Sequence, residues 1–172
     1  MKKITTLVFG LLLTASTLFG QAKRYALLEH FTNTLCSSCA GQNPSFFSTI
    51  KVETNTDVHH ISYHWRTPYL NCIYYQANQV PQDARADYYS VPGSPRASLN
   101  GATQTGLVYI TPPIIQDAAT TSPIYVKVGE VTNANLSRTA TIKVKSVGTL
   151  PTGPFKLHVA VVEKKTTYVS SF

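Results

Sequence analysis

The chain has 172 residues, of which 43% are hydrophobic, so it carries enough apolar side chains to fill a core. Its three cysteines are too few for a fold that depends on disulfides. The formal net charge is +7, but no cationic run is longer than a pair such as Lys164-Lys165, which argues against a nucleic-acid-binding protein.

The N-terminus has the pattern of a secretory signal peptide. Lys2 and Lys3 precede the apolar, uncharged run Ile4–Phe19, and Gly20 is a small residue suited to cleavage. The apolar run is shorter than the roughly 18 residues of a spanning helix, which favours a cleaved signal over a membrane anchor. We therefore expect residues 1–20 to be removed, leaving an exported protein without a transmembrane span.

Patterns of strands and helices alternate through residues 21–122, which we expect to form one domain. Period-two and helical spacing, with proline and glycine at the turns, define these elements. In chain order they are a strand, a helix that contains Pro44, a strand, a loop or irregular helix, a helix, a turn and strand ending in an Asn-Gly hairpin signal, a return strand and a helix. Their residues are Arg24–Phe31, Ser37–Val52, Asp57–Trp65, Arg66–Pro81, Gln82–Ser90, Val91–Gly101, Leu107–Ile110 and Pro113–Ala119. This order predicts a mixed four-stranded sheet with helices on both faces.

The composition changes after Ser122. Three segments alternate apolar and polar residues, which predicts antiparallel strands with one solvated face: 124–131, 138–147 and 155–163. Their predicted apolar face consists of Val126, Val128, Ile142, Val144, Val159 and Val161. A sandwich has about seven strands, so residues 123–172 predict an incomplete β-sandwich-like domain, and a chain truncated at its C-terminus.

Cys36 and Cys39 form a Cys-x-x-Cys pair at the predicted start of a helix. Such a pair serves as a redox centre, as half of a zinc site or as a structural disulfide, and the spacing alone does not choose. Export to an oxidising compartment favours a dithiol or disulfide over zinc. Cys36 should be the nucleophile, because the first helical turn stabilises a thiolate and solvent reaches it, and Cys39 should be the more buried resolving thiol.

Three separated motifs carry a family resemblance: LLEHFTNTLCSSC, the proline eight residues after Cys36, and SVPGSPRASLNG before a β region. The first region resembles the thioredoxin fold. The whole arrangement is similar to the Omp-twenty-eight-like outer-membrane protein family of Bacteroidetes, a thioredoxin-like domain followed by a β-sandwich. The resemblance implies a protein of the periplasm or one associated with the outer membrane.

The resemblance also implies site residues. It implies that the Ser94–Pro95 bond is cis, that Pro95 faces the cysteines, and that the Ser94 backbone pairs with a substrate strand. Thioredoxins place a buried acid six residues before the first cysteine, where this chain has His30. His30 is either the base that takes the proton of Cys39 or a packed strand residue.

Two positions depart from the thioredoxin pattern. Leu35 replaces the usual tryptophan before Cys36, which removes an aromatic platform for substrate. Arg96 replaces the usual threonine after the proline, and this cation beside the site would lower the pKa of Cys36 or select acidic partners.

The remaining cysteine and the histidines complete the set of candidates. Cys72 follows the strand 57–65 and is a third thiol, either reactive or inert. His60 and His64 should share one face of that strand and His59 the other, without a carboxylate at ligand spacing, so we expect no metal site.

The sequence therefore predicts an exported thiol-disulfide oxidoreductase acting through Cys36 and Cys39. Its partners would be protein thiols or disulfides in the periplasm or at the cell surface, and we expect no cofactor and no nucleic acid. The alternative is a non-enzymatic surface or outer-membrane-associated binding protein in which Cys36 and Cys39 form a structural disulfide.

Overall fold

The computed structural model describes residues 20–51, 55–102 and 105–163. The described residues belong to two compact units, one within Met1–Arg24 and Thr121–Thr152, the other within Tyr25–Thr120 and Gly153–Phe172. The predicted signal peptide lies outside the described residues, apart from Gly20. The predicted division into residues 1–20, 21–122 and 123–172 stays a prediction.

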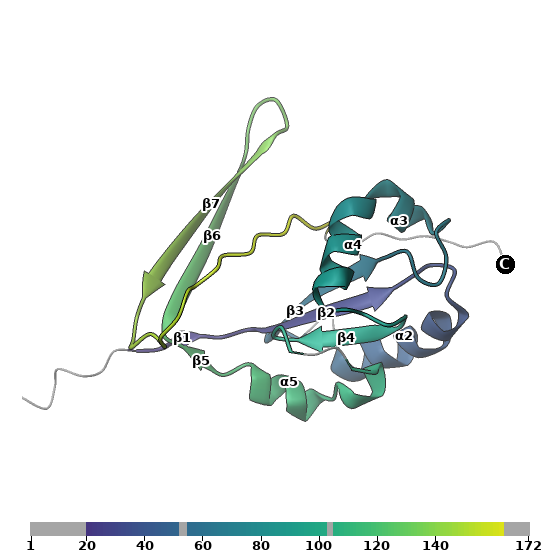
Figure 1. The fold of residues 1–172 in the computed structure, drawn as a ribbon. Helices are drawn as coiled ribbons and strands as arrows, with labels where there is room; N and C mark the ends of the chain where they lie inside the picture. Colours follow the sequence, from purple (N-terminus) through teal and green to yellow (C-terminus); the bar gives the residue numbers. More distant parts are fainter. Residues whose placement is uncertain (1–19, 52–54, 103–104, 164–172) are drawn as a thin grey trace, which may run out of the picture. The chain divides into compact units, whose positions relative to one another are not determined.

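The larger unit is built on a three-stranded mixed sheet in the order β3-β2-β4 (Figure 1). The central strand β2 (Ala26–Thr32) runs parallel to β3 (Val58–His64) and antiparallel to β4 (Arg96–Leu99). All residues of β2 except Leu27 are buried, as expected for a central strand covered on both faces.

Helices cover both faces of this sheet. Their bounds, with one 3₁₀ helix η2, are α2 Ser37–Ile50, α3 Ile73–Ala77, α4 Gln79–Tyr88, η2 Leu107–Tyr109 and α5 Pro112–Ala118. In Figure 1, α4 lies on one side of the sheet and α2 with α5 on the other. The α3 helix falls in the segment predicted as loop or irregular helix, and α4 begins three residues before its predicted start at Gln82.

Side-chain alternation along β2 divides the core in two. Ala26 and Leu28 pack with residues of α2, η2 and α5, including Phe46, Leu107 and Ile115. On the opposite face, Phe31 packs with a second cluster made of Trp65, Ala86 and Val91. Successive strand residues point to opposite faces, so a single strand supplies both cores.

The prediction of a four-stranded sheet is wrong within the described residues. The expected return strand at Leu107–Ile110 is the 3₁₀ helix η2. The hairpin itself forms, because Asn100 and Gly101 both adopt positive φ, at 52° and 80°, and Thr105 bridges back to Ala97. The returning chain thus pairs at one residue and then turns towards α5, whose first residue is a proline.

The described residues of the smaller unit form two separate antiparallel pairs. One joins β1 (Ala22–Lys23) to β5 (Thr121–Ser122), a pairing that the sequence did not predict. The other is the long hairpin of β6 (Ile124–Thr132) and β7 (Arg138–Ser146).

The prediction of a third strand at residues 155–163 is wrong, because this described segment is irregular and exposed. An alternating pattern shows that a segment can form a strand, but a strand also needs a hydrogen-bonding edge. Val159 and Val161 therefore do not join the predicted apolar face.

The apolar face of the β6–β7 hairpin forms as predicted at four positions. Val126 pairs with Val144 and Val128 pairs with Ile142 across the two strands. Val126, Val128 and Val144 are 49%, 62% and 54% exposed. The hairpin therefore presents an apolar face to solvent in this structure.

Candidate functional site

The turn that follows β2 places the two cysteines at the start of α2. Cys36 is the N-cap residue, with extended backbone angles (φ −80°, ψ 108°), and Cys39 lies in the first helical turn. The Asn33 side chain accepts a hydrogen bond from Leu35 N–H at 3.0 Å and fixes the turn. The Cys36 and Cys39 sulfurs are 2.19 Å apart, at disulfide distance, with Cα atoms 5.2 Å apart.

The Cys36 sulfur lies in a ring of polar groups. It accepts a hydrogen bond from Cys39 N–H at 3.1 Å, which makes the sulfur itself the cap of α2. The Ser38 hydroxyl lies 3.2 Å from the same sulfur, and the backbone carbonyl of Ser94 lies 3.8 Å away. The N–H donor and the positive end of the helix favour a thiolate at Cys36 once the pair is reduced.

The disulfide lies just beneath the surface. Cys36 is 3% exposed and Cys39 is 1% exposed. The expectation that solvent reaches Cys36 freely is therefore wrong for this disulfide state, because Ser38 and the Ser94 carbonyl cover the sulfur. The expected order of burial, with Cys39 deeper than Cys36, is confirmed.

The loop before β4 lies against the cysteines. The Ser94–Pro95 peptide bond is cis, which confirms the sequence expectation. Ser94 brings its carbonyl to the Cys36 sulfur and to the Ser38 hydroxyl, which lies 3.5 Å away. The structure therefore brings Cys36, Cys39 and Ser94 together, as predicted.

A cleft of about 330 Å³ opens beside this contact. Ser38 and Gln42 of α2 form one wall, Ser94, Pro95 and Arg96 form another, and Gly106 completes it. Because Ser38 and Ser94 also touch the Cys36 sulfur, the cleft borders the disulfide.

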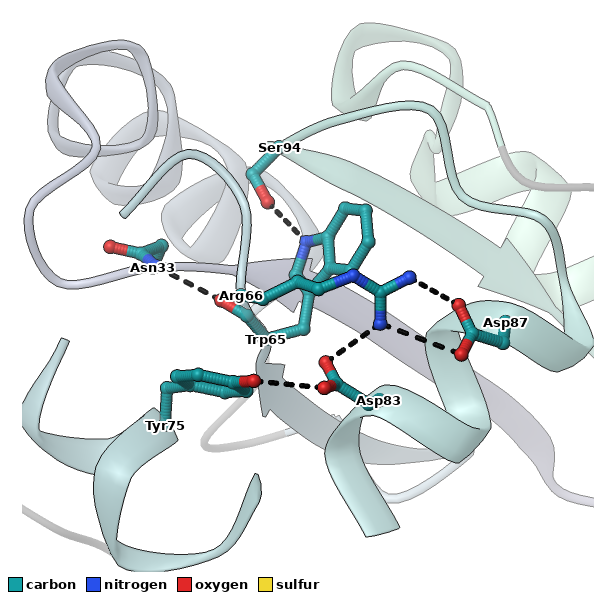
Figure 2. Close-up of polar contacts among 7 residues, drawn as sticks. All are labelled: Asn33, Trp65, Arg66, Tyr75, Asp83, Asp87 and Ser94. Atoms are coloured by element: carbon teal, nitrogen blue, oxygen red, sulfur yellow. Dashed lines mark hydrogen bonds and ion pairs between the residues drawn. The ribbon is translucent and has the colours of Figure 1, made fainter. Parts of the chain in front are cut away.

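A network that the sequence did not predict supports the Ser94 loop (Figure 2). The Trp65 indole N–H donates to Ser94 Oγ at 2.7 Å, and Ser94 Oγ–H donates to the Thr67 carbonyl at 3.1 Å. The Asn33 amide donates to the Trp65 carbonyl at 3.0 Å. Trp65 thus connects the turn before Cys36 to the loop that faces Cys36.

The sequence offered one signal for this role. Trp65 is the chain's one tryptophan and stands at the end of the predicted strand 57–65. Its side chain is 3% exposed and lies in the core, so it cannot serve as the aromatic substrate platform that is missing at Leu35.

Arg66, the next residue, forms ion pairs with Asp83 and Asp87 of α4, and Asp83 also accepts a hydrogen bond from Tyr75 (Figure 2).

His30 is completely buried on the face of β2 that packs against α2. Its ring contacts Phe46, Phe47 and His60, and neither ring nitrogen has a hydrogen-bond partner among the described residues. Burial lowers the pKa of His30 to about 3, and the charges of His60 and His64 act in the same direction. The imidazole is therefore neutral and weakly basic, and its predicted role as a base stays a prediction.

Cys72 is a free, fully buried thiol. It accepts hydrogen bonds from the Thr34 backbone N–H at 3.4 Å and the Thr34 hydroxyl at 3.1 Å. His64 Nδ1 lies 3.9 Å from the sulfur. Cys72 thus holds Thr34 in the turn that leads to Cys36, and it is not among the residues that line the cleft.

The other histidines lie in separate surroundings. His59 contacts Tyr25, whereas His60 contacts His30 and Phe47.

The described part of the chain contains no group of three or more His, Cys, Asp or Glu side chains placed to hold a metal ion. In that same part, none of the helices is long and apolar enough to cross a membrane.

On the other face of β2, a buried ion pair joins Glu29 to Arg85 of α4. Glu29 is 1% exposed and binds Arg85 of α4 through two contacts, at 2.6 and 2.8 Å. Tyr89 donates a further hydrogen bond to Glu29 at 2.6 Å. Burial alone would raise the pKa of Glu29, but the Arg85 and Tyr89 hydrogen bonds outweigh it and lower the pKa below the ordinary value. This network fixes α4 on the sheet.

Comparison of the chain with protein-family models, with curated proteins and with solved structures found no match. Function is therefore argued from the geometry of the site.

Proposed function

We propose that the protein is an exported thiol-disulfide oxidoreductase that acts through Cys36 and Cys39. The observation that carries the proposal is the position of the Cys36 sulfur, which caps α2 and accepts the Cys39 N–H at 3.1 Å beside an open cleft. A structural disulfide needs neither a thiolate-stabilising donor nor an adjoining cleft. Exchange needs both.

Exchange from the disulfide form proceeds in two steps. A substrate thiolate attacks the Cys36 sulfur, forms a mixed disulfide and releases Cys39 as a thiolate, which takes up a proton. A second substrate thiol then loses its proton and attacks the substrate sulfur, which forms the substrate disulfide and releases the Cys36 thiolate. Two electrons pass from the substrate dithiol to the Cys36–Cys39 disulfide, and the reverse sequence reduces a substrate disulfide.

The fold supports the proposal by its arrangement. We infer a thioredoxin-like domain whose sheet has three strands in place of the expected four. A central strand leads into a Cys-x-x-Cys pair at the start of a helix, and helices lie on both faces of the sheet. A periplasmic or outer-membrane-associated location and protein thiols or disulfides as partners are parts of the same proposal. They derive from the signal-peptide pattern and from the resemblance described above.

A second candidate has one observation in its favour. Cys36 is only 3% exposed, as expected of a structural disulfide in a non-enzymatic surface or outer-membrane-associated binding protein. We rank this second because the covering groups, Ser38 and the Ser94 loop, lie at a surface cleft.

Single cysteine substitutions distinguish the two candidates. In the oxidoreductase, Cys36→Ser abolishes exchange with a model disulfide, whereas Cys39→Ser accumulates a mixed disulfide that mass spectrometry detects. Cys72→Ser is the matched control and keeps exchange activity, because the Cys72 thiol is fully buried and a serine oxygen can still accept the hydrogen bonds from Thr34. Full exchange activity in both Cys36→Ser and Cys39→Ser would contradict the proposal.

A further inference from the structure

Arg96 is the charged residue of the cleft beside Cys36. Its guanidinium forms no hydrogen bond or ion pair with any residue that the structure describes. Arg66 and Arg85 of the same unit, in contrast, each bind carboxylates. A guanidinium carries five N–H donors in a fixed fork that matches a carboxylate, so Arg96 has unused binding capacity.

The residues around Arg96 place its guanidinium at the cleft. A Cβ atom built on Gly106 would lie 3.6 Å from Arg96 Nη1 and 3.6 Å from the Tyr109 ring. The guanidinium therefore lies over the Gly106 backbone, next to an aromatic ring that is 66% exposed. No Asp or Glu is among the residues that line the cleft, so its local charge is positive.

The position of Arg96 sets which substrate residue it meets. The Ser94 carbonyl lies 3.8 Å from the Cys36 sulfur, and Arg96 follows two residues later. Consecutive Cα atoms are about 3.8 Å apart, so Arg96 begins within about 8 Å of Ser94. An extended substrate advances about 3.3 Å per residue, so a side chain two or three residues from the reacting cysteine reaches this distance.

We propose that Arg96 forms a carboxylate-binding subsite, and that the substrates are proteins with Asp or Glu two or three residues from the cysteine that reacts with Cys36. This inference rests on the proposed exchange activity at Cys36. Gln42 and Ser38 line the same cleft and carry neutral hydrogen-bond donors. A charge-assisted pair of this kind in a partly enclosed cleft corresponds to a preference of about tenfold.

The test uses synthetic single-cysteine peptides as disulfide-linked homodimers. One set carries Asp two residues from the cysteine, on either side in separate peptides, and the matched set carries Asn. The reduced protein is mixed with each homodimer, and released peptide thiol is followed by chromatography. Each rate is divided by the rate of dithiothreitol with the same peptide, because a nearby carboxylate changes the reactivity of the peptide sulfur itself.

The wild-type protein should react about tenfold faster with an Asp peptide than with its Asn counterpart after this correction, and the ratio should fall as salt rises. Arg96→Gln should bring the ratio to about one. The control Arg24→Gln removes the same charge from a residue that does not line the cleft, and it should leave the ratio unchanged. A wild-type ratio of about one, or a ratio that Arg96→Gln retains, overturns the subsite.

A separate binding measurement keeps this result distinct from the proposed function. If neither the peptides nor glutathione disulfide react, the exchange activity is refuted. Peptides with serine in place of cysteine are then titrated by calorimetry. Tighter binding of the Asp peptide, lost in Arg96→Gln, upholds the subsite, whereas equal binding of the Asp and Asn peptides overturns it.

Discussion

The two sulfurs of the Cys36–Cys39 pair differ in their surroundings at the scale of single residues. Both residues are buried, at 3% and 1% exposure, but the Cys36 sulfur meets a backbone N–H, a hydroxyl and a carbonyl at the edge of a cleft, whereas Cys39 lies inside the first turn of α2. This asymmetry is what a two-step exchange requires, since one sulfur must meet the substrate and the other must remain inside.

One buried histidine, His30, and two partly buried ones, His60 and His64, also give the protein a pH dependence. The pKa values of His30, His60 and His64 are lowered by burial to about 3, 4 and 4, from an ordinary value of 6.5. The folded state holds these rings neutral, whereas the unfolded chain takes up their protons below about pH 6.5. Their contribution to stability is therefore complete above that pH and is lost as the pH falls towards the folded-state values.

We predict that the free energy of unfolding falls between about pH 6 and about pH 5, by up to about 1.4 kcal/mol per pH unit for each of these histidines. In His30→Leu, unfolding should take up about one proton fewer in this range, so the slope should be smaller. The substitution removes the ring with the lowest folded-state pKa of the three. Urea unfolding at a series of pH values measures the slope. An identical slope in wild type and His30→Leu would show that His30 takes up its proton in the folded protein.

At this scale the sequence predicted the close pair of Cys36 and Cys39 but not the residues that support it. Cys36, Cys39 and Ser94 are brought together as the motifs indicated. The Trp65–Ser94 hydrogen bond joins residues 29 positions apart, and a local pattern does not report which distant side chains meet. The burial of His30 follows from its central strand, but the aromatic rings around its nitrogens depend on packing.

At the scale of elements, the two longest described helices, α2 and α4, are fixed to the sheet by different contacts. Apolar packing through Phe46 and Ile50 holds α2, whereas α4 adds the buried pair of Glu29 and Arg85. Removing one partner of a buried pair leaves the other charge without compensation, which costs more than losing an exposed pair.

Glu29→Gln should lower the free energy of unfolding by about 3 kcal/mol, since it leaves the Arg85 guanidinium half-enclosed and without its carboxylate. Asp87→Asn is the matched control, because Asp87 also pairs with an arginine but its side chain is 60% exposed. That change should cost less than about 1 kcal/mol. Equal costs in urea unfolding of the two variants would mean that the Glu29 pair does not hold α4.

The predicted strands were confirmed where a segment with the right sequence periodicity also had a neighbouring strand to pair with. The segments 24–31 and 57–65 became β2 and β3, which pair with each other, and helix α2 began at the predicted Ser37. The segments 107–110 and 155–163 have strand-like composition but no strand partner in the structure. Pairing is decided by which sheet edge the returning chain reaches, and sequence alternation does not contain that information.

At the scale of the whole molecule, the two units differ in how their strands are stabilised. The β2 strand has neighbours on both edges and helices over both faces. The β6–β7 hairpin has one partner per strand, and Val128 on its apolar face is 62% exposed. An isolated two-stranded hairpin is marginally stable in water.

We predict that backbone amides of β6 and β7 exchange with solvent much faster than those of β2 in the purified chain. Hydrogen exchange followed by mass spectrometry measures both in one sample, with β2 as the internal reference. Strong protection of residues 124–146 would contradict this prediction and would show that another surface covers the Val126 and Val144 face.

The reduction potential of the Cys36–Cys39 pair tests the proposed function most directly. The purified protein is equilibrated with glutathione buffers, and the fraction of reduced pair is measured by thiol labelling and mass spectrometry. A Cys72→Ser background removes the third thiol from the measurement. An exchange catalyst should have a potential between about −270 and about −120 mV, the range of known oxidoreductases. A potential below about −300 mV would identify the disulfide as structural and would contradict the proposed activity.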